Sequence, residues 1–203
     1  MDQKQVINDI DRIARVDADV EQAVVNFGYP QPRIRAQGFE TFFTTIVGQQ
    51  ISVEAAAAIM QRVRDLLPRL DASSVLKLPE GALRQAGLSM RKVEYAQGLA
   101  HAILDGVFNP HDLPALQDED AVRAITALRG FGVWSAEIYL MFSLQRRDIF
   151  PADDLALQVA LQRLKGLDER PKEKQARELI RHWSPWRSAG SLFLWHYYRG
   201  APT

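Results

Sequence analysis

Hydrophobic residues recur along the chain at the spacing of three and four residues that places them on one face of a helix. Two segments show this spacing clearly, through Val6, Ile7, Ile10 and Ile13 in the first and Leu155, Val159, Leu161 and Leu164 in the second. No segment alternates polar and apolar residues convincingly, as a half-buried strand does. The pattern therefore predicts an all-α protein with about ten helices.

Polar caps and helix-breaking residues predict where these helices begin and end. Ser52 can cap a helix over 53–67, and Ser89 can cap a longer helix that follows it. Either Asp17 or Asp19 can begin a short helix near the N-terminus. Of the other predicted helices, one follows Gly38, one begins at 73 or 74, and one runs from 118 or 119 to 128. Four more span 80–86, 133–144, 171–183 and 186–198.

Composition excludes several classes of protein. The 203 residues contain no cysteine, which excludes disulfides, iron–sulfur clusters and thiolate metal sites. The four histidines lack the spacing of a zinc-binding pair, so no metal held by side chains is expected. No apolar run is long enough to cross a membrane, and Met1 to Arg15 is charged throughout, unlike a signal peptide. A cytoplasmic protein without membrane contact is expected.

The net charge of zero argues weakly against a nucleic-acid partner. The charge is unevenly distributed, because residues 151–203 carry nine basic and six acidic side chains. Charge alone favours an ordinary solvated helix surface over a binding site for nucleic acid.

A glycine-rich turn and a pair of acids carry the candidate chemistry. Gly130 and Gly132 let the backbone turn tightly just before the predicted helix 133–144. The N–H groups at the start of that helix can bind a phosphate. Asp153 and Asp154 then precede another helix, which either of them can cap. A carboxylate here is therefore either a structural cap or a catalytic group.

Two further polar features have both a structural and a functional interpretation. Gln49 and Gln50 lie in a tight turn between helices, either as ordinary turn residues or as side chains that enter a groove. Arg91 and Lys92 lie in the first turn of a helix, where the helix dipole disfavours cations. This placement favours an anionic partner, although exposed charges without a partner are the commoner explanation.

Five ordered motifs, spread over about residues 38–198, resemble those of the helix-hairpin-helix DNA glycosylases, and in particular their 3-methyladenine DNA glycosylase branch. The glycine turn in Leu128-x-Gly130-x-Gly132-x-x-Ser135-Ala136 resembles the hairpin itself. The other four are Gly48-Gln49-Gln50-Ile51-Ser52, Gly87-Leu88-Ser89-x-x-Lys92, Phe150-Pro151-Ala152-Asp153-Asp154, and Trp183-Ser184-Pro185-Trp186-Arg187-Ser188 with Leu194-Trp195. The β-rich domain that precedes these motifs in some members has no counterpart in this sequence, so a minimal version is expected.

The resemblance implies two helical lobes with an active-site cleft between them. Residues 34–149 would form the central lobe with the hairpin, and residues 1–33 plus 150–203 would form the second. It implies that Asp154 is catalytic and that Asp153 caps the following helix. The implied substrate-pocket residues are Trp134, Trp195, Phe42 and Tyr139, although Phe42 and Tyr139 are more often ordinary core. The implied DNA-binding residues are Gln49, Gln50 as the wedge, Gly130, Gly132, Val133, Ser135 and Lys92.

The resemblance also implies a function: release of 3-methyladenine and 7-methylguanine from double-stranded DNA after base flipping, by a monomer without a cofactor. Related glycosylases that also cut the strand carry a hairpin lysine, and Trp134 occupies that place here, which implies hydrolysis without lyase activity. A hairpin of this family can also hold a monovalent cation on its backbone, here near Gly130 and Gly132. A glycosylase for oxidised bases and a non-catalytic DNA-binding protein remain as alternatives.

Overall fold

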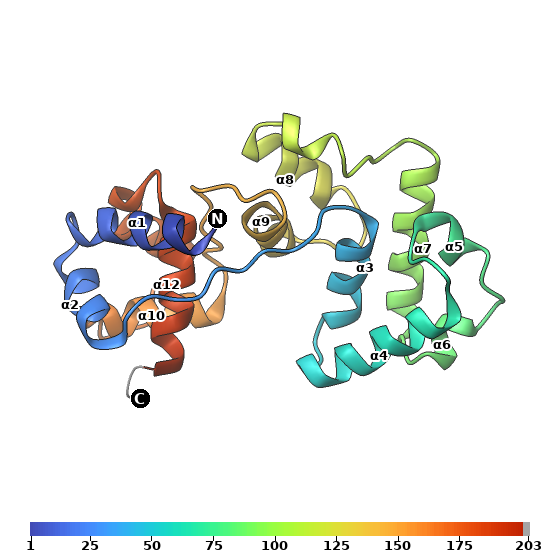
Figure 1. The fold of residues 1–203 in the computed structure, drawn as a ribbon, viewed down its shortest axis with the longest axis horizontal. Helices are drawn as coiled ribbons and strands as arrows, with labels where there is room; N and C mark the ends of the chain where they lie inside the picture. Colours follow the sequence, from blue (N-terminus) through green and yellow to red (C-terminus); the bar gives the residue numbers. More distant parts are fainter. Residues whose placement is uncertain (201–203) are drawn as a thin grey trace. The chain divides into compact units, whose positions relative to one another are not determined.

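The computed structural model describes residues 1–200, and this part of the chain consists of α-helices and short 3₁₀ helices without a β-strand (Figure 1). The prediction of an all-α fold is confirmed. None of the helices in this part has a stretch that is long and apolar enough to span a membrane. The helices are α1 (Gln3–Ala14), α2 (Ala18–Phe27), α3 (Phe39–Gly48), α4 (Val53–Leu66), α5 (Ala72–Leu76), α6 (Ala82–Gln85), α7 (Met90–Leu104), η1 (Leu113–Ala115), α8 (Asp118–Thr126), α9 (Val133–Phe142), α10 (Leu155–Leu164), α11 (Glu173–Leu179), η2 (Arg181–Trp183) and α12 (Arg187–Gly200).

The chain forms two compact units. Unit 1 contains Met1–Ile34 and the chain from Glu137 onward, and unit 2 contains Arg35–Ala136. The division implied by the family resemblance assigned 137–149 to the central lobe instead. The division in the structure falls inside α9, whose end packs with unit 1 through Phe142. An uninterrupted helix gives no sequence signal for such a division.

Unit 1 is a bundle in which α12 packs against α1, α2 and α10. Its core contains the fully buried side chains of Ile10, Ile13, Trp183 and Phe193. At Gly190, α12 lies so close to the ring of Trp183 that an added Cβ would be 2.5 Å from the ring atom Cε3. The glycine therefore permits the close packing that holds α12 in place.

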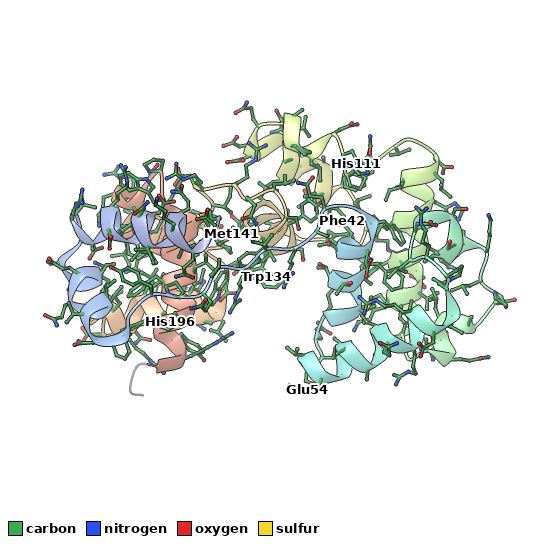
Figure 2. The ribbon with its side chains drawn as sticks, in the orientation of Figure 1. Phe42, Glu54, His111, Trp134, Met141 and His196 are labelled. Carbon is green, nitrogen blue, oxygen red and sulfur yellow. The ribbon has the colours of Figure 1, made fainter. Side chains whose placement is uncertain are left out.

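Unit 2 is organised around α7, which packs against α3, α5 and α6. Phe42 of α3 (labelled in Figure 2) meets Phe108 and Phe131 edge to face, in each case with ring centroids 5.4 Å apart. Phe131 belongs to the glycine turn, so this aromatic cluster anchors the hairpin to the core of the unit.

Most predicted helix starts are confirmed. The side chains of Ser52 and Ser89 accept hydrogen bonds from the backbone N–H groups of Ala55 and Lys92. Of the two candidates for α2, Asp17 is the cap. These caps act over three residues, so the sequence alone is enough to identify them.

Some details of the predicted helices are wrong, and α6 is shorter than the predicted 80–86. The helix predicted to start at 73 or 74 begins earlier, because Asp71 caps it. The helix predicted over 171–183 is interrupted and forms α11 and η2. Leu155, expected in the core, is 57% exposed because it is the first residue of α10 and lies at the rim of its buried face.

Candidate active site

Asp154 lies at the start of α10 and accepts a hydrogen bond from Trp195 of α12. Its Oδ1 atom accepts one hydrogen bond from the backbone N–H of Leu157 at 3.0 Å and another from Nε1 of Trp195 at 3.1 Å. The residue is partly exposed. The two hydrogen bonds fix the direction of the carboxylate. This is the kind of fixed negative charge that can stabilise a positive charge developing on a substrate.

The prediction that Asp153 caps α10 is wrong. Asp154 is the N-cap residue, and Asp153 is exposed one position earlier. The backbone N–H of Asp154 bonds to the carbonyl of Pro151, and this turn puts Asp154, not its neighbour, at the helix start. Capping and catalysis are therefore not divided between the two acids, because the candidate catalytic acid is also the cap.

Three side chains hold the segment that leads to Asp154, and the sequence assigned a role to none of them. Ser188 Oγ accepts from the backbone N–H of Ile149 at 2.9 Å, and Nε2 of Gln158 donates to the carbonyl of Ala152 at 2.8 Å. Nη1 of Arg177 donates to the carbonyl of Phe150 at 3.0 Å. These contacts fix the backbone on the approach to the candidate acid.

Arg177 in turn bonds to Glu137 of α9 at 2.9 Å. Burial raises the pKa of the Glu137 carboxyl, while the bond to Arg177 opposes that shift. The pair connects α9 and α11 within unit 1, so the segment before Asp154 is attached to both helices.

Replacing Ser188 by alanine should destabilise the protein by about 1–3 kcal/mol, because the buried N–H of Ile149 loses its acceptor. Urea unfolding at neutral pH measures this loss. Ser73→Ala is the control, because Ser73 is only half-buried on α5 and no hydrogen bond of its hydroxyl is seen in the described residues, so a change within about 0.5 kcal/mol is expected there. Equal small effects of the two substitutions would contradict the assigned role of Ser188.

The ring of Trp195 lies in an aromatic and cationic environment. Its centroid is 5.8 Å from that of Phe142, and the planes of the two rings are inclined by 41°. The guanidinium carbon of Arg33 lies 5.7 Å from the centroid of Trp195 and 5.9 Å from that of Phe142. The indole thus contacts the candidate acid through its N–H and a cation through its face.

In unit 2, the hairpin is held by close packing and by a long-range hydrogen bond. Gly130 has φ +96°, and an added Cβ would collide with the ring of Tyr95. Its carbonyl accepts a hydrogen bond from Nε2 of Gln49 at 2.8 Å. A cation at this carbonyl would have to use its second lone pair.

The turn after α3 holds two glutamines with different surroundings. Gln49 turns inward to the hairpin, which differs from the expectation that its side chain enters a groove. Gln50 is exposed and has φ 58°, a left-handed conformation that is strained in a non-glycine residue. Of the two, Gln50 is the one presented at the tip of the turn.

Lys92 supports the same turn from α7. Its Nζ donates to the carbonyl of Val47 at 2.7 Å, close to the C-terminus of α3, where a cation is favoured. Partial burial lowers the pKa of the Lys92 ammonium group. The bond to Val47 therefore explains why a lysine lies in the first turn of α7, where the helix dipole disfavours a cation. The sequence could not reveal this contact.

The predicted pocket residues fall into two groups. Phe42 and Tyr139 are 1% and 4% exposed, so both rings are core residues, which corrects the prediction that they line a pocket. Trp134 is 41% exposed on the first turn of α9 (Figure 2). Gly132 and Val133 are also exposed, and Ser135 partly so, as an anion-binding helix start requires.

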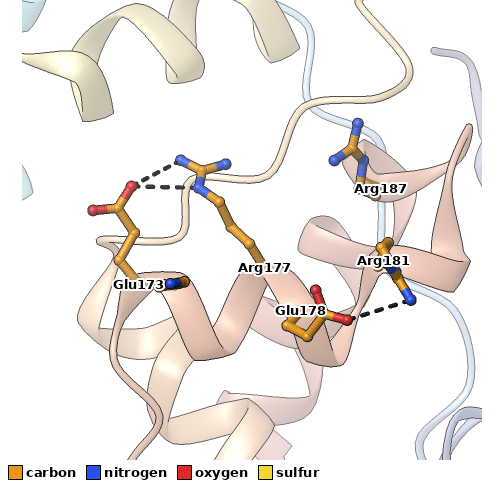
Figure 3. A pocket seen from close by; sticks show the side chains of 6 residues that line it. Glu173, Arg177, Glu178, Arg181 and Arg187 are labelled. Carbon is orange, nitrogen blue, oxygen red and sulfur yellow. Dashed lines mark hydrogen bonds and ion pairs between the residues drawn. The ribbon is translucent and has the colours of Figure 1, made fainter.

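A charged surface pocket of about 440 Å³ lies elsewhere on unit 1 (Figure 3). Its lining pairs acids with bases, including Arg177 with Glu173 and Arg181 with Glu178. None of the predicted site residues lines it. Residues 1–200 contain no group of acidic or histidine side chains that could hold a metal ion.

Comparison with known proteins identifies relatives over most of the chain. The Bacillus subtilis protein YfjP is 34% identical over 122 residues, which cover 60% of this chain and 42% of YfjP. The Escherichia coli DNA-3-methyladenine glycosylase 2 is 29% identical over 192 residues, covering 87% of this chain and 65% of that protein. This chain thus spans less than two thirds of the length of either relative.

The crystal structure of a DNA-3-methyladenine glycosidase from Bacillus halodurans superimposes with a TM-score of 0.85 and 29% identity. The match covers 95% of this chain and 89% of that one. Residues 43–185 match the family model described as HhH-GPD superfamily base excision DNA repair protein. These residues include the hairpin, the turn at Gln49 and Gln50, and Asp154, so the chain belongs to the HhH-GPD superfamily of base excision DNA repair proteins.

Proposed function

We propose that this chain is a monofunctional DNA glycosylase that removes alkylated purines, in particular 3-methyladenine and 7-methylguanine, from double-stranded DNA. The observation that carries the proposal is Asp154, a partly exposed carboxylate directed by two hydrogen bonds within a chain of this superfamily. Relatives named as DNA-3-methyladenine glycosylases support the substrate class. We propose that the protein acts as a monomer inside the cell, without a cofactor.

Asp154 is proposed to act on the flipped nucleotide. Breaking the N-glycosidic bond builds positive charge on the sugar, as in glycoside hydrolysis. A carboxylate next to C1′ stabilises this charge and can accept a proton from the attacking water. The water oxygen then bonds to C1′, the base leaves with the glycosidic electron pair, and an abasic site remains. The N–H of Trp195 would hold the carboxylate in this direction.

The proposed DNA contacts lie in unit 2. The exposed backbone from Gly132 to Trp134, with Gly130 and Ser135 beside it, would bind a phosphate and fix the register of the strand. Gln50 would fill the space that the flipped base leaves. Gln49 and Lys92 would support this contact by bonding to the backbones of the hairpin and of α3.

The substrate follows from the aromatic rings. A purine alkylated at N3 or N7 is cationic and already activated to leave, and an aromatic face attracts it by roughly 0.5–2 kcal/mol. Trp195, next to Asp154, and the exposed Trp134 are the proposed rings. Little hydrogen bonding to the base is then needed.

The test uses the native protein on three matched duplexes containing 7-methylguanine, 3-methyladenine or 8-oxoguanine. Release of the two methylated bases, intact strands and no covalent adduct after borohydride reduction are expected. Release of 8-oxoguanine alone would favour the oxidised-base alternative. Binding without release of any base would favour a non-catalytic DNA-binding protein.

A further inference from the structure

We infer that Arg33 determines which bases the protein accepts, because its guanidinium occupies the aromatic face beside Asp154 and an entering base must displace it. This inference rests on the proposed function, and it adds a specificity residue that lies outside the five sequence motifs. The group concerned consists of Arg33, Phe142, Asp154 and Trp195, all of which belong to unit 1.

The contacts connect the four residues directly. The guanidinium carbon of Arg33 lies 5.7 Å from the centroid of Trp195 and 5.9 Å from that of Phe142, both within the range of a cation–π interaction. Nε1 of the same indole lies 3.1 Å from Oδ1 of Asp154. The aromatic surface nearest the candidate catalytic carboxylate is thus already in contact with a cation.

Arg33 is placed where it can leave this surface. It is exposed and lies between α2 and α3, in a segment without regular secondary structure (Figure 1). Moving its side chain therefore breaks no helix. At an exposed site, a cation–π contact changes an equilibrium constant by about two- to fivefold.

Displacement of Arg33 has different consequences for cationic and neutral bases. A cationic alkylpurine that takes this ring face restores the cation–π interaction that Arg33 gives up there. A neutral base displaces the guanidinium without an equivalent gain. Arg33 therefore disfavours neutral bases relative to cationic ones, which is specificity achieved by penalising the wrong ligand.

The test compares two duplexes that are identical except for the target base, 7-methylguanine in one and the neutral hypoxanthine in the other. Single-turnover release at saturating protein gives the ratio of the two rates, and any general loss of DNA affinity cancels in this ratio. For Arg33→Ala, the ratio of 7-methylguanine to hypoxanthine release should fall by about two- to fivefold, mainly through faster release of hypoxanthine. Arg33→Lys keeps the charge and should restore most of the ratio.

Arg12→Ala is the matched control. Arg12 is also exposed and lies over a tryptophan, 5.5 Å from the ring of Trp186, so this substitution removes the same charge and the same kind of contact elsewhere in unit 1. Its ratio should equal that of the native protein. An unchanged ratio for Arg33→Ala would overturn the inference. A higher ratio for Arg33→Ala than for the native protein would also overturn it, because the base would then bind a ring face that Arg33 does not cover. No release of either base by the native protein would overturn the proposed function itself.

Discussion

Replacing Asp154 by asparagine is expected to slow the release of alkylated bases by about 10²–10⁴-fold, as is typical when one positioned acid–base group is lost. Asparagine caps helices about as well as aspartate, and its side-chain oxygen can still accept from Leu157 and Trp195. The substitution therefore removes the negative charge and leaves the local fold. Single-turnover release of 7-methylguanine from a methylated duplex measures the effect.

Asp153→Asn is the matched control, because it removes one negative charge from the adjacent, exposed position. Its rate should stay within a few-fold of that of the native protein, since an exposed carboxylate is strongly screened by water. Unfolding midpoints of both variants establish that each is folded. If Asp154→Asn retained most of the activity, the Asp154 carboxylate would be only a helix cap and base release would depend on another group.

Replacing Asp17 by asparagine is expected to destabilise the protein by about 3 kcal/mol, a value at the low end of the range for breaking a buried ion pair. The buried Asp17 carboxylate accepts from Nζ of Lys165 at 2.5 Å, Nε1 of Trp183 at 2.7 Å and Nε2 of His182 at 3.0 Å. Lys165 has only 14% of its side chain exposed, but after this substitution its ammonium group still has Asp19 as an acidic partner. The expected loss is therefore at the low end of the range.

Asp19→Asn is the control, because Asp19 bonds to the same lysine at 2.9 Å but has 53% of its side chain exposed. An exposed ion pair contributes only about 0–1 kcal/mol. Urea unfolding at neutral pH should therefore separate the two variants clearly. Equal losses would show that burial of the Asp17 carboxylate adds nothing to the stability of unit 1.

The pH dependence of stability gives a second measure of the same carboxylate. Burial would raise the pKa of Asp17, but hydrogen bonds from Lys165, Trp183 and His182 outweigh it, and the pKa is lowered. The stabilisation is therefore fully present above the ordinary carboxyl pKa and is lost as the pH falls through the lowered value. The native protein should lose more stability than Asp17→Asn between about pH 4 and pH 2.

Local sequence patterns were enough to predict the helices and to shortlist the functional residues. Helical periodicity and caps depend on residues three or four positions apart, so Ser52 and Ser89 could be recognised as caps directly. The motif resemblance identified the segment that contains Asp154. The residue pattern by itself offered two adjacent acids, Asp153 and Asp154, as the cap of α10. Only the turn at Pro151 decided that choice in favour of Asp154.

Roles that depend on a partner far away in the sequence became visible only in the folded chain. The bond from Trp195 to Asp154 spans 41 residues, and the bond from Gln49 to Gly130 spans 81. Phe42 became a core residue because the ring of Phe131 packs against it. Such contacts depend on how helices pack, and the period of a single helix carries no information about which residue its neighbour will present.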